Sequence, residues 1–230
     1  MPGVGGGLLA VLADEAPGQL AEMERWYEDA HLYERSAIEG FLYSRRYISL
    51  TGQPRSLTLY EIDGPEVLHG EGYAKAWERE NAIAERRKAA GNPIPQRMTN
   101  VVRNEYALLS ATGTHVGEVG AFIWMVREDV AEADEAALEE WYAQHLPLVS
   151  AIGTVRGVRR YRATVGTPRF LTVYDLATAE TVEGEAWRRA FDAPGGEVRA
   201  RRTEVLENLA QFFKYVDHAD ALREMAKWSE

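Results

Sequence analysis

The stretch Trp26-Tyr27-Glu28-Asp29-Ala30-His31-Leu32 returns in the second half of the chain as Trp141-Tyr142-Ala143-Gln144-His145-Leu146. The match continues downstream of each His at a constant spacing. Arg45-Arg46-Tyr47 matches Arg159-Arg160-Tyr161, and Leu57-Thr58-Leu59-Tyr60-Glu61 matches Leu171-Thr172-Val173-Tyr174-Asp175. A pattern repeated over this length predicts one pseudo-symmetric body that is built from two similar halves.

Hydrophobic periodicity predicts the same order of elements in both halves: strand, helix, strand, strand, helix, strand. The expected ranges are 7–13, 19–37, 41–51, 56–62, 65–90 and 101–110 in the first half, and 120–126, 135–152, 157–165, 170–176, 181–200 and 203–215 in the second. This order is typical of a ferredoxin-like (βαββαβ) unit, a four-stranded antiparallel sheet with both helices on one face.

The predicted fold class is therefore α+β. Two ferredoxin-like repeats, residues 1–112 and 119–216, are expected to bury the bare faces of their sheets against each other. Residues 113–118 would link the repeats, and residues 217–230 would form a C-terminal helical tail.

Composition excludes several classes of partner. The net charge of −10 over 230 residues argues against nucleic acid and against anionic membranes, both of which require clustered Lys and Arg. The absence of cysteine excludes disulfides, thiolate nucleophiles and cysteine-based metal sites. No apolar stretch reaches the roughly 20 residues of a membrane helix, and the start does not resemble a signal peptide. We therefore expect a cytoplasmic protein whose partner is a small molecule.

Residues 26–47 carry a resemblance to a known family. The Trp-Tyr-x-x-x-His-Leu pattern, followed by Gly40-Phe41 and Arg45-Arg46-Tyr47, resembles the dimeric α+β barrel superfamily and, within it, the EthD-like branch. The resemblance covers both halves and implies a tandem fusion that forms the barrel as an internal pseudo-dimer, alone or as a homodimer of such chains. Members include polyketide cyclases, cofactor-free monooxygenases, lactone isomerases and haem-dependent peroxidases, so the resemblance implies a fold rather than a reaction.

His31 and His145 are the candidate catalytic residues, because each ends a predicted helix and a His side chain transfers protons near neutral pH. The segment from Trp141 to His145 is one residue shorter than that from Trp26 to His31. On a regular helix this places Tyr27 beside His31, which adds Tyr27 to the catalytic candidates, but places Trp141 beside His145. We therefore expect two unequal pockets, with the first as the functional one. The alternative is that both histidines cap the last carbonyls of their helices.

The candidate substrate-binding residues are aromatic, Arg and Asn side chains, most of them at matched positions in the two halves. They are Tyr47, Tyr60, Tyr161, Tyr174, Arg46, Arg160, Trp77, Trp124, Asn104 and Asn208. Tyr hydroxyls and guanidinium groups hold negative charge that develops on a substrate. The alternatives are core packing for the rings, ion pairs with carboxylates such as Glu61 or Asp175 for the arginines, and backbone hydrogen bonds for the asparagines.

No metal or nucleotide cofactor is expected, because the chain has no His-x-x-x-His, His-Glu-x-x-His, Gly-x-Gly-x-x-Gly or Walker pattern. Haem stays an open alternative, since one His suffices as its proximal ligand. We expect a cofactor-independent lyase, cyclase or isomerase that uses His acid/base chemistry on a small aromatic or hydrophobic molecule. The alternatives are a cofactor-free monooxygenase acting on a phenol or hydroquinone, and a non-catalytic protein that binds a hydrophobic ligand or serves as an accessory.

Overall fold

The computed structural model describes residues 4–228, which fall into two compact units. We call them the His31 unit (5–47, 54–103 and 213–228) and the His145 unit (4, 48–53 and 104–212). Both unit boundaries near residues 103 and 212 lie inside long strands, so each unit takes part of these strands. The repeat boundaries expected from the sequence stay a prediction.

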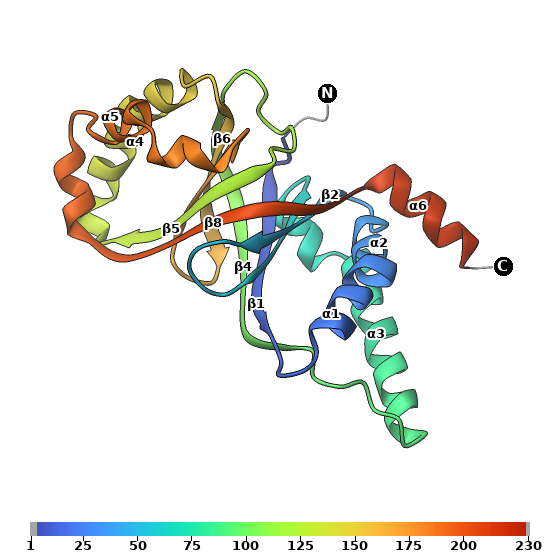
Figure 1. Cartoon of the computed structure of the whole chain (residues 1–230). Coiled ribbons are helices and arrows are strands. Elements are labelled where there is room, and N and C mark those ends of the chain that lie inside the picture. The colour runs from blue at the N-terminus through green and yellow to red at the C-terminus, as the bar shows by residue number, and fades with distance from the viewer. Residues whose placement is uncertain (1–3, 229–230) are drawn as a thin grey trace. The chain divides into compact units, whose positions relative to one another are not determined.

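The strands form one closed antiparallel barrel, hydrogen-bonded in the order β1-β3-β2-β8-β5-β7-β6-β4, which confirms the predicted α+β fold class (Figure 1). The strands are β1 Gly7–Glu15, β2 Phe41–Ser49, β3 Ser56–Ile62, β4 Met98–Thr112, β5 Phe122–Val130, β6 Val155–Val165, β7 Phe170–Leu176 and β8 Arg202–Asp217. The alternating strand and hairpin signals located all eight, and β3 and β7 have the predicted bounds.

In the His31 unit, the first helical segment has three parts: α1 (Leu20–Trp26), a π-helical turn (Tyr27–His31) and α2 (Leu32–Ser36). A 3-10 turn (Pro65–His69) precedes the long helix α3 (Glu71–Ala89). The C-terminal helix α6 (His218–Lys227) confirms the predicted tail helix and packs against α2 (Figure 1). The core between these helices and the strands contains residues such as Leu9, Met23 and Tyr60.

In the His145 unit, α4 (Glu135–Ser150) follows a 3-10 turn at Glu132–Asp134, and α5 (Glu185–Phe191) lies between 3-10 turns at Ala179–Glu183 and Gly196–Arg201. The predicted helix over 181–200 is therefore wrong at both ends. Pro194 disfavours helical backbone at the residue before it, and Gly195 takes a left-handed conformation (φ +83°), so α5 stops at Phe191.

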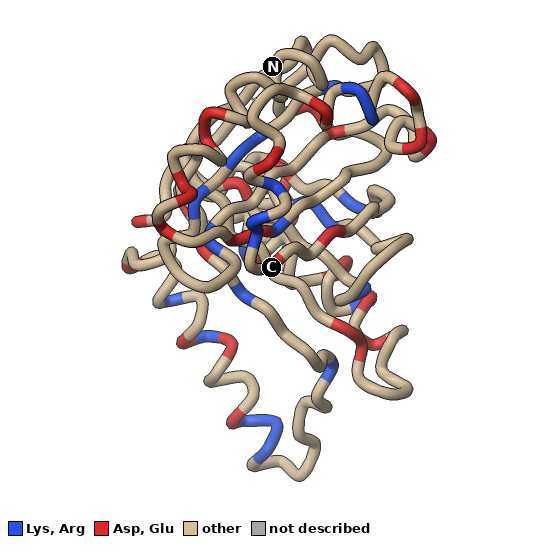
Figure 2. Tube along the Cα trace, turned by 90° about the vertical axis from the view of Figure 1, so that its left-hand side faces the viewer, with Lys and Arg blue, Asp and Glu red and all other residues tan. Residues whose placement is uncertain are grey.

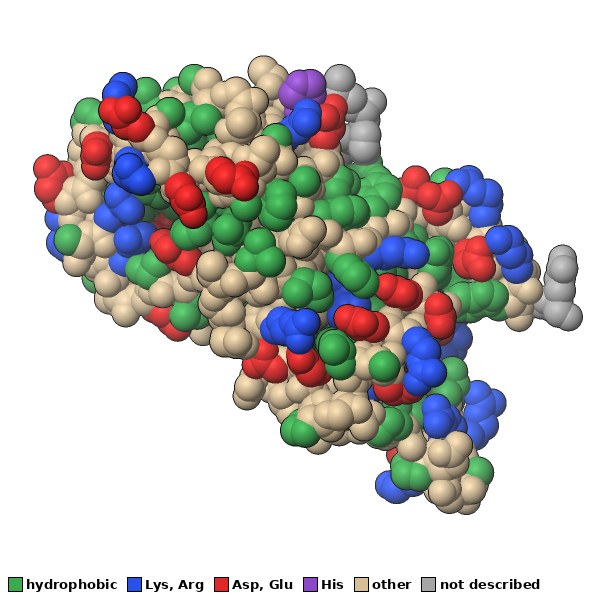
Figure 3. Space-filling view, in the orientation of Figure 1, with side chains coloured by type: hydrophobic (Ala, Val, Ile, Leu, Met, Phe, Trp, Pro, Cys, Tyr) green, Lys and Arg blue, Asp and Glu red, His purple; other side chains and the backbone are tan. Residues whose placement is uncertain are grey.

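The surface carries mixed charge. Figure 2 shows acidic and basic residues interspersed along the trace, and Figure 3 shows apolar side chains between charged ones on the visible face. Within residues 4–228, no helix combines the length and apolarity that crossing a membrane requires.

Candidate functional site

A cavity of about 300 Å3 lies in the His31 unit and is lined mainly by aromatic and apolar side chains. This volume is at the lower end of the range for small-molecule sites, about 300–1,000 Å3. Four of the candidates named from the sequence line it: His31, Tyr27, Tyr60 and Trp77. The structure thus brings residues from the first helical segment, β3 and α3 to one place.

The π-helical turn sets how His31 meets its neighbours. Five residues, Tyr27 to His31, complete this turn, and the imidazole of His31 lies 4.0 Å from the Trp26 ring, centroid to centroid. In α4, Trp141 and His145 are four residues apart and their rings stack at 4.6 Å. The π-helical turn contains one residue more than an α-helical turn, so it accommodates the extra residue between Trp26 and His31. The expected difference between the two helix faces is wrong, because a Trp ring packs on the His ring in both halves, with an interplanar angle of 31° in the first and 12° in the second.

Tyr27 still lies beside His31, as predicted, with its ring at 5.5 Å in an edge-on arrangement. Its phenol is buried and its hydroxyl is 3.5 Å from the sulfur of Met98. Burial raises the pKa of Tyr27, with Thr58 and Arg46 opposing the change, so the phenol keeps its proton.

Glu80 fixes the tautomer of His31. Nδ1 of His31 lies 3.2 Å from Oε1 of Glu80, and the other carboxylate oxygen accepts a hydrogen bond of 2.6 Å from Arg35. Because a carboxylate accepts, Nδ1 of the neutral imidazole carries the proton and Nε2 keeps its lone pair. Burial would raise the pKa of Glu80, but the hydrogen bond and charges of His31 and Arg35 outweigh it and lower the pKa.

His31 itself is held in its neutral form. Burial lowers the pKa of His31, and Glu80 opposes this change only in part. The sequence analysis missed Glu80, which is 49 residues away. A signal was present, since Glu80 follows Trp77 by three residues on a predicted helix and shares its face.

Tyr60 contributes to the lining of the cavity, and its hydroxyl is buried. The side chain is buried, and the hydroxyl has no hydrogen-bond partner among the described residues. Its ring centroid is 6.3 Å from that of His31. Burial raises the pKa of Tyr60 well above its ordinary value, so this group is a hydrogen-bond donor at neutral pH.

The equivalent groups of the His145 unit are bonded to each other. Nδ1 of His145 lies 2.8 Å from the carbonyl oxygen of Ala190 and therefore donates to it, so Nε2 accepts the hydrogen bond of 3.0 Å from the Tyr174 hydroxyl. Trp141 and Phe191 pack on the imidazole, the latter at 4.4 Å between centroids. Burial lowers the pKa of His145 to about 4. Neither His caps its own helix.

The arginine candidates lie in the layer between sheet and helices. Arg160 pairs with Glu139 at 2.6 Å and stands 3.5 Å from the Tyr142 ring centroid, while buried Arg46 lies 4.3 Å from the Tyr27 ring centroid. The arginines that precede these candidates by one position form the ion pairs considered from the sequence. Arg45 pairs with Glu61 at 2.9 Å, and Arg159 pairs with Asp175 at 2.9–3.1 Å.

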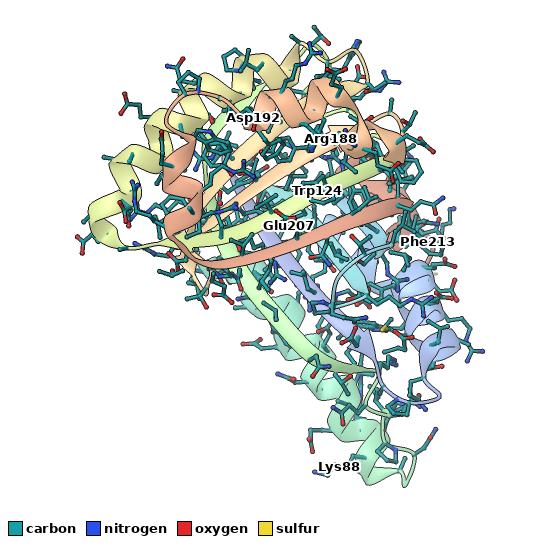
Figure 4. All side chains as sticks on the ribbon, turned by 60° about the vertical axis from the view of Figure 1, so that its left-hand side comes forward. Lys88, Trp124, Arg188, Asp192, Glu207 and Phe213 are labelled. Carbon is teal, nitrogen blue, oxygen red and sulfur yellow. The ribbon has the colours of Figure 1, made fainter. Side chains whose placement is uncertain are left out.

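The remaining candidates lie away from this cavity's lining. Tyr47 and Tyr161 are buried. Trp124 on β5 packs near Trp187, at 6.4 Å between ring centroids (Figure 4). Their surroundings are those of core residues.

Asn104 and Asn208 hold hairpin turns of the backbone. The amide of Asn104 donates to the Thr167 carbonyl at 2.8 Å and to the Tyr106 hydroxyl at 2.9 Å. The amide of Asn208 donates to the Thr51 carbonyl at 3.3 Å and to the Ser49 hydroxyl at 3.0 Å. These contacts are the backbone role that the sequence analysis gave as the alternative to ligand binding.

The groups around the cavity include candidate ligands for a metal or for haem. His31, Glu34 and Glu80 place one candidate ligand atom each within 4.8 Å of one another, but Glu80 already neutralises Arg35. His31 offers Nε2 as one axial ligand for haem, and nothing else in the described lining distinguishes a haem pocket from an aromatic one. We therefore derive no step through either group.

The sequence matches no protein-family model and no curated protein. Solved structures do share the fold. An anthrone oxidase-like protein aligns with a TM-score of 0.64 and 13% identity over 94% of both chains. A candidate monooxygenase from Fusobacterium nucleatum aligns with a TM-score of 0.62 and 11% identity over 94% of this chain and 96% of the other. A candidate chlorite dismutase aligns with a TM-score of 0.54 and 14% identity over 94% of this chain and 97% of the other. At these identities the likeness concerns the fold alone: an eight-stranded α+β barrel of the ferredoxin-like type.

Proposed function

We propose that the protein is an enzyme that moves a proton on a small molecule held between His31 and Tyr60. One observation carries this proposal: His145 and Tyr174 close on each other at 3.0 Å, whereas no hydrogen bond joins His31 to Tyr60, and both of these line a cavity. In the His31 unit, a polar group of the substrate would bond to His31 and to Tyr60. In the His145 unit, the equivalent groups of His145 and Tyr174 bond to each other.

Each group has a distinct role in this proposal. Glu80 accepts the proton of Nδ1 and so leaves Nε2 of His31 as the base. His31 is neutral at pH 7, which a base requires. The proton comes from an acidic C–H or O–H, and the hydroxyl of Tyr60 donates to the oxygen on which negative charge develops.

The walls favour an aromatic or otherwise hydrophobic substrate. Trp26, Tyr27, Tyr73 and Trp77 contribute rings to the lining, which suits a flat apolar molecule with few polar groups. Lyase, cyclase or isomerase chemistry needs no more than this base, this donor and this enclosure. The proposal therefore includes no cofactor.

A cofactor-free monooxygenase is the second candidate, and the names of the first two structural neighbours favour it. The first step is the same: His31 removes the proton of a phenol or hydroquinone. The substrate anion then reacts with molecular oxygen, with the electrons coming from the substrate. Consumption of oxygen during turnover separates this reaction from proton transfer alone.

We also propose that the chain is a tandem fusion within the EthD-like branch. The sequence repeat supports this, as does the packing of the Trp26 ring on His31 and of the Trp141 ring on His145. Residues 1–112 expressed alone are then expected to self-associate or to be insoluble. A stable monomeric half would contradict the fusion.

Deuterium exchange into a panel of phenols and 1,3-dicarbonyl compounds, followed by NMR, tests the proton transfer directly. We expect His31→Ala to abolish exchange and Tyr60→Phe to slow it, while the circular dichroism spectrum stays unchanged. The control is His115→Ala, since the side chain of His115 is half-exposed, pairs with Glu118 and does not line the cavity. A folded His31→Ala variant with full exchange activity would refute the assignment, and ligand binding without any exchange would favour the non-catalytic alternative.

A further inference from the structure

A second hollow of about 410 Å3 adjoins the cavity. It lies between α3, the first helical segment and the chain that leads into β4. Four residues line both spaces: Trp26, Trp77, Glu80 and Arg97. We call this second hollow the outer groove.

Beyond the shared residues, the outer groove combines apolar side chains with the polar groups of Glu34, Asn81 and Arg87. Ile83 and Ala84 come from α3, and Ile94 comes from the following loop. Ile83 is 40% exposed, and the shared Trp77 is 43% exposed. Nε of Arg87 donates to the Asn92 carbonyl at 3.2 Å, which ties this loop to α3 near the helix end that Lys88 marks in Figure 4.

An arginine side chain lies over each of the two indole rings that line both spaces. The guanidinium of Arg97 lies 5.1 Å from the Trp26 ring centroid, and that of Arg35 lies 5.1 Å from the Trp77 ring centroid. Both rings present apolar surface to both spaces. A single molecule that passes from the cavity to the groove therefore meets indole rings on its way and then isoleucine side chains.

We propose that the outer groove is the second half of the ligand site and takes an apolar tail of the molecule whose polar head occupies the cavity. This inference rests on the proposed function only for the place of the head, beside His31 and Tyr60. The ligand class is then an aromatic or enolic head with an alkyl or acyl extension. Burying the extension removes the apolar surface of Ile83 and Trp77 from water.

Binding of a series of para-alkylphenols to the intact protein, measured by calorimetry, tests the inference. Phenol alone probes the cavity. As the alkyl chain lengthens into the groove, Kd is expected to fall about fourfold with each added methylene, since burying one contributes about 0.8 kcal/mol. We expect Ile83→Asp and Ile94→Asp to abolish this dependence on chain length and to leave the affinity for phenol unchanged.

Leu222→Asp is the matched control, because Leu222 on α6 is 49% exposed and does not line the groove. It should keep the full dependence on chain length. A Kd that does not change with chain length, or an equal dependence in Ile83→Asp, Ile94→Asp and Leu222→Asp, would overturn the inference. Failure of the proposed function looks different: the dependence on chain length would persist while Tyr60→Phe and His31→Ala left phenol affinity and proton exchange unchanged.

Discussion

Replacing Tyr174 and Tyr60 by Phe gives two matched perturbations with opposite expected effects on stability. Both tyrosines are buried and occupy equivalent places in the repeated Leu-Thr-x-Tyr pattern. The hydroxyl of Tyr174 donates to Nε2 of His145, whereas the hydroxyl of Tyr60 has no partner among the described residues.

The magnitudes follow from what each variant leaves behind. Tyr174→Phe leaves a buried imidazole nitrogen without a donor, which costs about 1–3 kcal/mol of the free energy of unfolding. Tyr60→Phe removes a polar group that makes no bond, so we expect a change within about 0.5 kcal/mol. With a urea m-value of about 2 kcal/mol per molar, a loss of 2 kcal/mol lowers the unfolding midpoint by about 1 M.

Urea unfolding followed by circular dichroism measures both variants under one set of conditions. The slope should stay constant, so that a shifted midpoint reports stability. An equal loss for the two variants would refute the reasoning, because it would mean that the Tyr60 hydroxyl has a partner and is not available to a ligand.

Glu80→Gln removes the negative charge that raises the pKa of His31 and replaces the carboxylate acceptor by a weaker amide oxygen. The NMR titration of His31 and the acid limb of the pH–rate profile should therefore move to lower pH, and an unmoved titration would contradict the role of Glu80. His145, with its pKa lowered to about 4 against an ordinary 6.5, binds its proton more readily unfolded than folded. The free energy of unfolding should therefore fall by up to about 3 kcal/mol as pH drops from about 6.5 to 4. An imidazole NMR signal of His145 that titrates near 6.5 would be incompatible with its burial. Gly52→Ala should destabilise the fold more than Gly18→Ala in thermal unfolding. Both glycines have positive φ, +76° and +74°, but a Cβ at Gly52 would lie 2.4 Å from a backbone carbonyl oxygen, whereas Gly18 has no atom within 4 Å. The strain at Gly18 is about 1 kcal/mol, and equal losses would show that the clash at Gly52 relaxes.

Local sequence patterns were sufficient for most of the fold. Alternating apolar residues and the turn at Gly52 located β2 and β3, and the repeat transferred the same reading to β6 and β7. The helix predicted over 181–200 failed because periodicity was carried through Pro194-Gly195. A Pro-Gly pair inside an amphipathic pattern ends a helix even where the apolar spacing continues beyond it.

The site was predictable only in part. His31, Tyr27, Tyr60 and Trp77 were named from the sequence and line one cavity. The π-helical turn was not predicted, because the sequence was read with regular α-helical spacing, on which Trp26 and His31 lie on different faces, whereas in the structure their rings are 4.0 Å apart. The closing of His145 on Tyr174 likewise depends on Phe191, whose packing cannot be deduced from residue type alone.

The two asparagine contacts become possible at different stages of chain synthesis. The turn around Thr51 is secured by Asn208, which follows it by 157 residues, while Asn104 secures the turn at Thr167 across only 63. At a synthesis rate of roughly 5–20 residues per second, the first turn waits about 8–30 s for its partner to emerge. The second turn meets an asparagine that the ribosome has already released. The two halves therefore acquire the same contact in opposite temporal order, and the turn around Thr51 lacks its asparagine contact during that interval.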